Sequence, residues 1–324
     1  MTGRSAVPVA SGASVSGYVE VPEGWERLGA EGPGPFVTAE LLRAPDGHVV
    51  RWRSRSHRKS SDGRRRFAGA GGDAPREPVW WRPRRRQWWM AVLFMVGSAC
   101  FLVGGVAAQW STTSRPAIGV VFFVGSIFFT SAAYLQYAEA VNAERGVGQP
   151  PGAATRRWRP VSWEPHRIDW LASLVQFVGT LFFNVTTFTG MKHGFTVHQS
   201  NARVWAPDAL GSIAFLVSSE LAYAEVCHRW VGFRWSSLSW RIVGLNLLGS
   251  IAFGISAIAS FVEPATGEPV SARLANGGTS LGGLCFLVGA LLLMPEAAAE
   301  ERAAADTGAP AGAQAAASSG IAGV

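Results

Sequence analysis

The sequence has only three cysteines, Cys100, Cys227 and Cys285, among its 324 residues. All three fall in or beside apolar stretches, so the chain lacks the disulfide framework of a secreted domain, and we interpret them as small core residues. A zinc-protease motif, a glycine-rich phosphate loop and a serine nucleophile elbow are also missing. His193 and His198 share a loop that has no cysteine or acidic partner. The sequence therefore predicts no catalytic residue, metal or cofactor, and an enzyme is the least supported class.

Charge is almost missing from six stretches of about 20 residues, the length needed to cross ~30 Å of hydrocarbon. They cover residues 88–108, 117–137, 170–190, 208–226, 242–262 and 274–294. The N-terminus, MTGRSAVPVASG, has no apolar core of the kind found in a cleaved signal peptide. The predicted fold class is therefore an all-α integral membrane protein with six transmembrane helices.

Positive charge is concentrated before the first apolar stretch, where 13 of the 29 Lys and Arg residues lie between Arg51 and Arg86. This block ends in VWWRPRRRQWW. Tryptophan prefers the headgroup level and arginine the cytoplasmic leaflet, so we interpret the segment as an anchor on anionic lipid. Nucleic-acid binding would need aromatic residues on a folded platform and is the weaker alternative. The predicted anchor residues are Trp80, Trp81, Arg82, Arg84, Arg85, Arg86, Trp88 and Trp89.

The loops between the apolar stretches alternate in basic charge. The loops at 138–169 and 227–241 carry five and three arginines, whereas the other three loops carry one, two and one Lys or Arg. By the positive-inside rule, both termini of this multi-pass protein are expected in the cytoplasm of a bacterium, with the helices in its inner membrane.

Outside the apolar stretches, the chain divides by composition. Residues 1–35 are predicted to be mostly disordered, and 36–79 to form a small basic region with a β-hairpin around Ala44-Pro45-Asp46-Gly47. Membrane hairpins are predicted at 80–139, 170–226 and 240–296, joined by a linker at 140–169 and a loop at 227–239. Residues 297–324 are predicted to be a disordered Ala/Gly-rich tail, and the segment EAAAEER at residues 296–302 can prolong the last helix by a turn or two.

A short motif recurs in all six apolar stretches: Gly, then Ser, Thr or Gly, then two residues, then Phe. Its glycines are Gly97, Gly125, Gly179, Gly211, Gly249 and Gly282. The odd stretches add a Trp nine residues before the Gly, and the even stretches add a Glu fourteen residues after it. These carboxylates are Glu139, Glu225 and Glu296. We interpret the chain as three tandem copies of one two-helix hairpin.

Helical geometry assigns each motif position a place. At about 100° per residue, the Gly and the Phe four residues later share one face, where a small residue lets another helix approach closely. The Trp nine residues earlier lies on the opposite side and is expected to face lipid headgroups. The Glu returns to the packed side, where Arg167 or Arg241 could pair with it.

The recurring Gly-Ser-x-x-Phe motif in a two-helix unit resembles the YrhK-like family of small bacterial membrane domains. The resemblance covers the three hairpins, and does not extend to residues 1–79 or the tail. Because the function of that family is uncharacterised, the resemblance implies no catalytic residues for this chain.

Two polar features within the apolar stretches are candidates for function. Gln176, Thr180 and Asn184 share one helix face, and Asn246 takes the position of Gln176 in the fifth stretch. Interhelical hydrogen bonding is the structural interpretation of this stripe, and the lining of a solute path is the alternative. Glu220 is the one carboxylate clearly inside a stretch. Because a charged side chain in a membrane is costly, such a residue is a candidate for a functional role.

The predicted function is a noncatalytic membrane scaffold or sensor with a basic, Trp-rich surface anchor. A small-solute or proton-coupled transporter, using Glu220 and the polar stripe, is the alternative. Besides lipid, a second copy of the chain or another membrane protein remains open as a partner.

Overall fold

The structure is a computed structural model that describes residues 21, 23–56, 58–59, 80–83, 85–110, 114–143 and 158–308. Several predictions lie outside these residues: the start of the N-terminal region, most of the linkers at 60–79 and 144–157, the anchor residue Arg84, and the tail from 309 onward.

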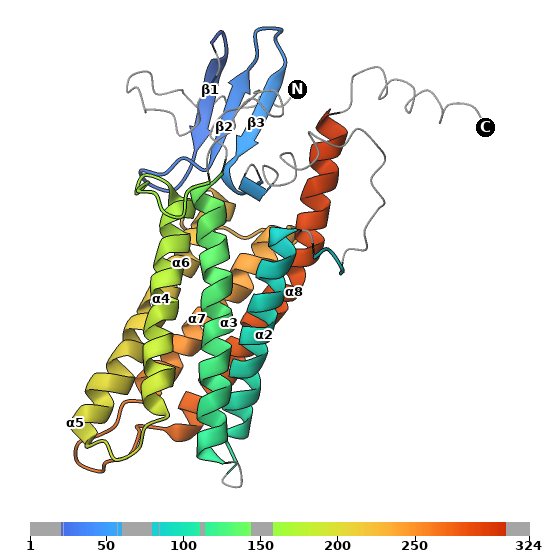
Figure 1. Ribbon diagram of the computed structural model, residues 1–324. Helices are drawn as coiled ribbons and strands as arrows, with labels where there is room; N and C mark the ends of the chain where they lie inside the picture. Colours follow the sequence, from blue (N-terminus) through green and yellow to red (C-terminus); the bar gives the residue numbers. More distant parts are fainter. Residues whose placement is uncertain are drawn as a thin grey trace.

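Six helices are long and apolar enough to cross a membrane, as expected (Figure 1). Five of them are α2 (Arg86–Ala107), α3 (Arg115–Val141), α4 (Ile168–Gly190), α7 (Leu238–Ala259) and α8 (Ala272–Gly308). The remaining one is continuous from the short α5 (Val197–Ser200) through a π-helical turn, η1 (Asn201–Trp205), into α6 (Ala206–Cys227). These helices are compatible with an integral membrane protein.

Two helix boundaries differ from the prediction. The fourth apolar helix begins at Val197, eleven residues before the predicted start, so that Asp208 lies well inside it. The last helix includes EAAAEER, as expected, but continues to Gly308, further into the segment that was expected to be disordered. Alanine and glutamate favour helix, which explains why the helix does not stop where the hydrophobicity stops.

The helices form a closed ring. Each long helix packs against the next one along the chain, and α8 returns to pack against α2. One end of the ring carries the β-sheet, and the other carries α5 and the loops around it (Figure 1). We call these the sheet end and the α5 end.

The sheet has three antiparallel strands in the order β1 (Glu26–Glu31), β2 (Ala39–Arg43) and β3 (Val49–Arg53). The predicted hairpin of β2 and β3 is confirmed: the Gly47 N–H donates to the Ala44 carbonyl at 2.9 Å, and Gly47 has a φ of 89°. β1 was not predicted, because this edge strand is mostly exposed and charged and shows no apolar alternation. Leu42 of β2 and Trp52 of β3 form the small buried core of the sheet.

The motif glycines are sites of close helix contact. A Cβ on Gly97 would lie 2.9 Å from the Gly125 carbonyl oxygen, and a Cβ on Gly282 would lie 3.0 Å from that of Gly249. Gly211 likewise faces the Gly179 carbonyl, at 3.2 Å. Glycine at these positions lets the two helices of each pair approach backbone to backbone.

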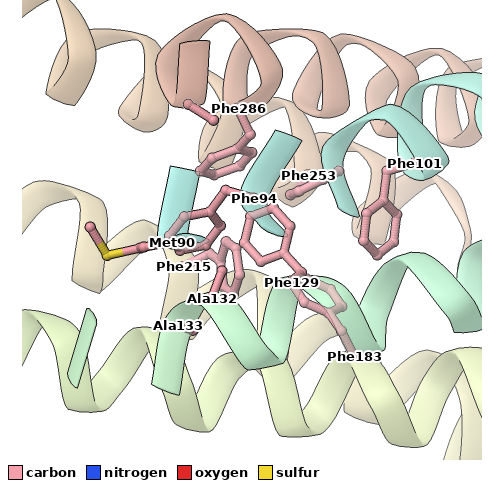
Figure 2. Close-up of a cluster of buried hydrophobic side chains, with 11 residues drawn as sticks. Met90, Phe94, Phe101, Phe129, Ala132, Ala133, Phe183, Phe215, Phe253 and Phe286 are labelled. Carbon is pink, nitrogen blue, oxygen red and sulfur yellow. The ribbon is translucent and has the colours of Figure 1, made fainter. Parts of the chain in front are cut away.

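The six motif phenylalanines, one from each long helix, gather in one buried cluster between the helices, at the centre of the ring (Figure 2). They form two triangles with ring centroids 5.5 to 6.5 Å apart. The α5-side triangle is Phe101, Phe183 and Phe253, and the sheet-side triangle is Phe129, Phe215 and Phe286. The space left between them is about 10 Å³. That volume holds at most about one water molecule, so the stacked triangles close the axis of the ring.

Candidate functional site: a buried charge hub at the sheet end

A short basic segment follows β3 and lies in the mouth of the ring at the sheet end. It consists of Ser54, Arg55, Ser56, Arg58 and Lys59, all in helical conformation, with His57 outside the described residues. Arg55, Arg58 and Lys59 have the i, i+3, i+4 spacing that places side chains on one helix face. Arg58 and Lys59 are buried, so they need counter-charges inside the protein.

Two of the carboxylates at the ends of the even helices bind this segment. Glu225 accepts the Ser54 hydroxyl at 2.6 Å and the Arg58 guanidinium at 3.1 Å. Glu296 accepts two N–H groups of Arg55, at 3.1 and 3.2 Å, and is also paired with Lys59. Two parallel N–H···O bonds make the Arg55 pair a fork in the strong geometry of guanidinium and carboxylate.

The third carboxylate, Glu139, joins the same cluster through Gln87. The Gln87 amide donates to Glu139 at 3.2 Å and to the main-chain carbonyl of Lys59 at 3.0 Å. Asp169 connects the other side, lying 3.1 Å from Arg58 and 2.6 Å from Arg167. We call this assembly, the four carboxylates Glu139, Asp169, Glu225 and Glu296 together with the basic segment, the charge hub.

The hub is held by mutual neutralisation. Burial alone would lower the pKa of Arg58, but the carboxylates of Glu225, Asp169 and Glu139 raise it above its ordinary value. Arg55 has the same balance: burial opposes the charge, and Glu296 outweighs it and raises the pKa. Both arginines are therefore charged at any physiological pH. Removing one partner would leave a buried charge with less compensation.

The expected partners of the three carboxylates are corrected by this geometry. Arg167 pairs with Glu164 and Asp169, and Arg241 is exposed. The partners come instead from the segment between the sheet and the first helix, which sequence reasoning treated as part of a hairpin and connector. The basic i, i+3, i+4 spacing was a usable signal, because three cationic side chains on one helix face need carboxylate partners if that face is buried.

The tryptophans at the starts of the odd helices are also placed differently from the prediction. Trp170 and Trp240 are 1% and 8% exposed, so the expectation that they face lipid headgroups is wrong for both. Trp170 packs on Tyr137, and the Trp240 N–H donates to the Gly232 carbonyl at 2.9 Å. The chain segment that precedes each of these helices folds back over the tryptophan side chain and covers it.

An exposed aromatic residue seven positions earlier lies edge-on to each of these tryptophans. The pairs are Trp81 with Trp88, Trp163 with Trp170, and Phe233 with Trp240, with ring centroids 5.4, 5.4 and 4.7 Å apart. The outer partners are 64%, 78% and 74% exposed. Aromatic side chains thus surround the sheet end as a rim, which we call the aromatic rim.

The predicted anchor lies on this rim. Trp80, Trp81 and Trp89 are exposed, whereas Trp88 is half-buried between Trp81 and Trp89. Arg82, Arg85 and Arg86 are half-buried, and each takes part in interactions within the protein. The described arginines are therefore not simply a solvated patch.

The polar stripe is occupied by interhelical hydrogen bonds. Gln176 accepts from Gln136 at 3.2 Å and from Ser218 at 3.4 Å, and Asn184 accepts from Thr130 at 3.2 Å. The Thr180 hydroxyl donates to the Phe177 carbonyl within its own helix. These bonds join α4 to α3 and α6.

The remaining polar candidates lie apart from that stripe. The Asn246 main-chain carbonyl accepts from Ser219 at 3.5 Å, which joins α7 to α6. Glu220 is half-buried in α6, and within the described part of the chain no hydrogen bond or ion pair is found for it. Among these residues, no hydrogen bond joins Glu220 to Gln176, Thr180, Asn184 or Asn246, although its neighbours Ser218 and Ser219 bond to Gln176 and Asn246.

Comparison with protein families, with curated proteins and with solved structures found no match to this chain. Among the described residues, no group of three or more His, Cys, Asp or Glu side chains is arranged to hold a metal ion. The hub is therefore described by its own geometry, which is that of a buried ionic joint.

Proposed function

We propose that this protein is a noncatalytic membrane scaffold that holds a small β-sheet module against the cytoplasmic surface of a bacterial inner membrane. The observation that carries the proposal is the charge hub. Carboxylates from α3, α4, α6 and α8 converge on one segment that directly continues β3. A second joint supports it, because Thr38, next to β2, bonds to His228 at the end of α6 at 2.9 Å.

The architecture supports a triplicated origin. The motif glycines pack pairwise, the motif phenylalanines form two triangles, and an aromatic pair marks the start of each odd helix. We propose that the bundle consists of three tandem two-helix hairpins, of the kind that the YrhK-like resemblance implies. Each hairpin then contributes its motif carboxylate to the hub, and Asp169 of α4 adds a fourth.

The aromatic rim supports a membrane boundary at the sheet end. Exposed Trp and Phe side chains favour the headgroup level, and the basic loops lie on the same side. We propose that this side is cytoplasmic and contacts anionic lipid. A peptide of residues 78–90 should bind anionic vesicles, and changing its four arginines to glutamine should weaken binding about tenfold or more at low salt. Equal binding of both peptides would contradict the anchor.

A transporter has less support. The two phenylalanine triangles close the ring axis, the polar stripe is engaged in hydrogen bonds between helices, and Glu220 does not line the cavity at the α5 end. A static scaffold needs no open path.

The two lysines of the chain, Lys59 and Lys192, provide a direct test. Lys59 is buried in the hub, whereas Lys192 is exposed at the α5 end. In purified protein, an amine-reactive reagent should modify Lys192 quickly and Lys59 slowly. Glu296→Gln should increase Lys59 modification about tenfold or more, because it removes the carboxylate that is paired with Lys59. A tenfold change corresponds to a loss of roughly 1.4 kcal/mol of protection.

The matched control is Glu220→Gln, which removes a carboxylate outside the hub and should leave both rates unchanged. In intact cells, a reagent that does not cross membranes should reach Lys192 alone if the sheet end is cytoplasmic. Equal modification of Lys59 and Lys192 in the wild-type protein would show that the hub does not form.

A further inference from the structure

The α5 end of the ring contains a cavity of about 850 Å³. All six long helices contribute to its wall, and the α5-side triangle of Phe101, Phe183 and Phe253 lies at its base. Its volume falls within the range of small-molecule sites, about 300 to 1,000 Å³. Because the triangles close the axis, this cavity ends inside the protein and is a pocket rather than a channel.

One carboxylate lines this cavity, and it lies inside a continuous helix. Asp208 follows the π-helical turn η1, in the part of the α5–α6 helix that faces the ring interior. Pro207 has no N–H to donate to the Arg203 carbonyl. The Thr189 hydroxyl of α4 donates to that carbonyl at 2.7 Å instead, so a neighbouring helix stabilises the turn. A π-turn inside a membrane-length helix is often found at functional sites.

The Asp208 carboxylate has no counter-charge among the residues that the structure describes. Its one hydrogen bond within the described residues comes from the Ser260 hydroxyl, at 3.4 Å, and no cationic side chain of these residues lies within ion-pair distance. The hub shows the opposite arrangement, in which Glu225 and Glu296 are each paired with basic side chains. A carboxylate enclosed between helices without a counter-charge is costly to retain for structure alone.

The walls around Asp208 suit an organic cation. Phenylalanine rings line the base of the cavity, and the face of such a ring carries the negative quadrupole that attracts ammonium groups. The basic residues of the cavity, Arg115, Lys192 and His193, are exposed at its rim, where salt screens their charge. Inside the cavity the carboxylate is therefore the main fixed charge.

We propose that this cavity binds a small organic ammonium compound, with its nitrogen on Asp208 and its apolar body over the α5-side triangle. The site is independent of the hub and extends the scaffold to a receptor for a ligand that enters from the α5 end. The ligand class follows from one unpaired carboxylate, an aromatic base and a closed axis.

The test uses the full chain in phosphatidylcholine nanodiscs, with radiolabelled benzylammonium as the probe and empty nanodiscs as the blank. Equilibrium dialysis should show saturable binding to the protein. Asp208→Asn should weaken that binding about tenfold or more, since a hydrogen bond to a charged group commonly contributes at least that much. Glu220→Gln removes a carboxylate of the same helix outside the cavity and should leave binding unchanged.

A second variant keeps the test decisive if Asp208→Asn folds poorly. Ser260→Lys places an ammonium group beside Asp208 within the chain and should abolish benzylammonium binding. Neutral benzyl alcohol should bind the wild type and Asp208→Asn equally, because it lacks the charge. The proposal is overturned if the wild type binds no more benzylammonium than empty nanodiscs do, or if both Asp208→Asn and Ser260→Lys bind it as well as the wild type.

Discussion

The two ends of the ring differ in whether their carboxylates are paired with basic side chains. At the sheet end, buried carboxylates of the helices meet basic side chains from a segment outside the ring, and the mouth is filled. At the α5 end, Asp208 meets no cation of the described residues, and the mouth is open into a cavity. The same ring of helices thus ends in a joint on one side and in a pocket on the other.

The difference shows where a helical ring obtains its polar partners. Hydroxyl groups can be satisfied within the ring, as when the Ser256 hydroxyl donates to the Ala275 carbonyl at 2.7 Å. Neutral side chains of the ring can donate to a carboxylate, as Gln87 does to Glu139, but they do not balance its charge. The backbone of a continuous helix also has few free donors. A carboxylate therefore needs a partner brought from elsewhere. At the sheet end the chain supplies one, and at the α5 end we propose that a ligand does.

The largest expected effect comes from the layer that separates the two ends. Phe215→Ala removes a buried side chain of the sheet-side triangle. It should cost about 3 to 5 kcal/mol of unfolding free energy, which denaturant unfolding in detergent would measure. Phe188→Ala, which removes a phenylalanine that is 48% exposed, is the control and should cost much less. Equal losses would mean that the triangles do not stabilise the ring.

A smaller loss should follow from breaking the joint itself. Glu225→Gln leaves Arg58 without its main carboxylate partner. It should cost about 2 kcal/mol, because Arg58 stays buried and loses a charged hydrogen-bond acceptor, with Asp169 still within ion-pair distance. Thermal unfolding would report the loss, and hydrogen exchange should show faster exchange in the sheet. The control is Glu263→Gln, which changes an exposed carboxylate at the α5 end. If Glu263→Gln is equally destabilising, the contrast between the two ends fails.

The smallest effect concerns pH at the second joint. Burial and the nearby Arg234 lower the pKa of His228, so the folded protein favours the neutral ring. Below the ordinary histidine pKa of 6.5 the unfolded chain binds a proton more readily than the folded one. The stability contributed by this residue is therefore lost as the pH falls from that value through the folded-state pKa. Lower pH should loosen the contact of Thr38 with His228.

His228→Asn should flatten this pH dependence, because it removes the titrating ring. The φ of His228 is 59°, in the left-handed region. Asparagine tolerates that backbone conformation, so the substitution adds little strain. Hydrogen exchange of the sheet between about pH 7 and pH 5, the range in which histidine titrates, would measure the effect. The matched variant, His193→Asn at the α5 end, should retain the wild-type profile. An unchanged profile in His228→Asn would assign the pH response to another group.

Much of the fold could be predicted from local pattern. The apolar stretches located the six helices, because length and the absence of charge are local properties, and the Pro-Asp-Gly turn located the hairpin of β2 and β3. β1 was missed because an exposed edge strand carries no hydrophobic signal. The full length of the α5–α6 helix was missed because polar residues at its start hide its continuity.

The candidate sites depended on contacts that local pattern does not contain. The spacing of Glu139, Glu225 and Glu296 marked them as equivalent, yet their partners lie up to 241 residues away along the chain. Asp208 was taken as the edge of a stretch, and only the packing of α5 and η1 on α4 shows it to be internal. Charge pairing over such separations is a property of the closed ring.

The sequence by itself determined the number of helices, the recurring Gly and Phe positions, and the residues able to cross the membrane, because each depends on composition or helical period alone. The tertiary structure decided what those positions do. Ring closure brings six phenylalanines to one axis, buries tryptophans expected at the lipid surface, and gives Glu225 and Glu296 a basic partner while leaving Asp208 without one among the described residues. The physical reason is that electrostatic pairing and packing depend on distance in space, and distance in space is set only when the ring closes.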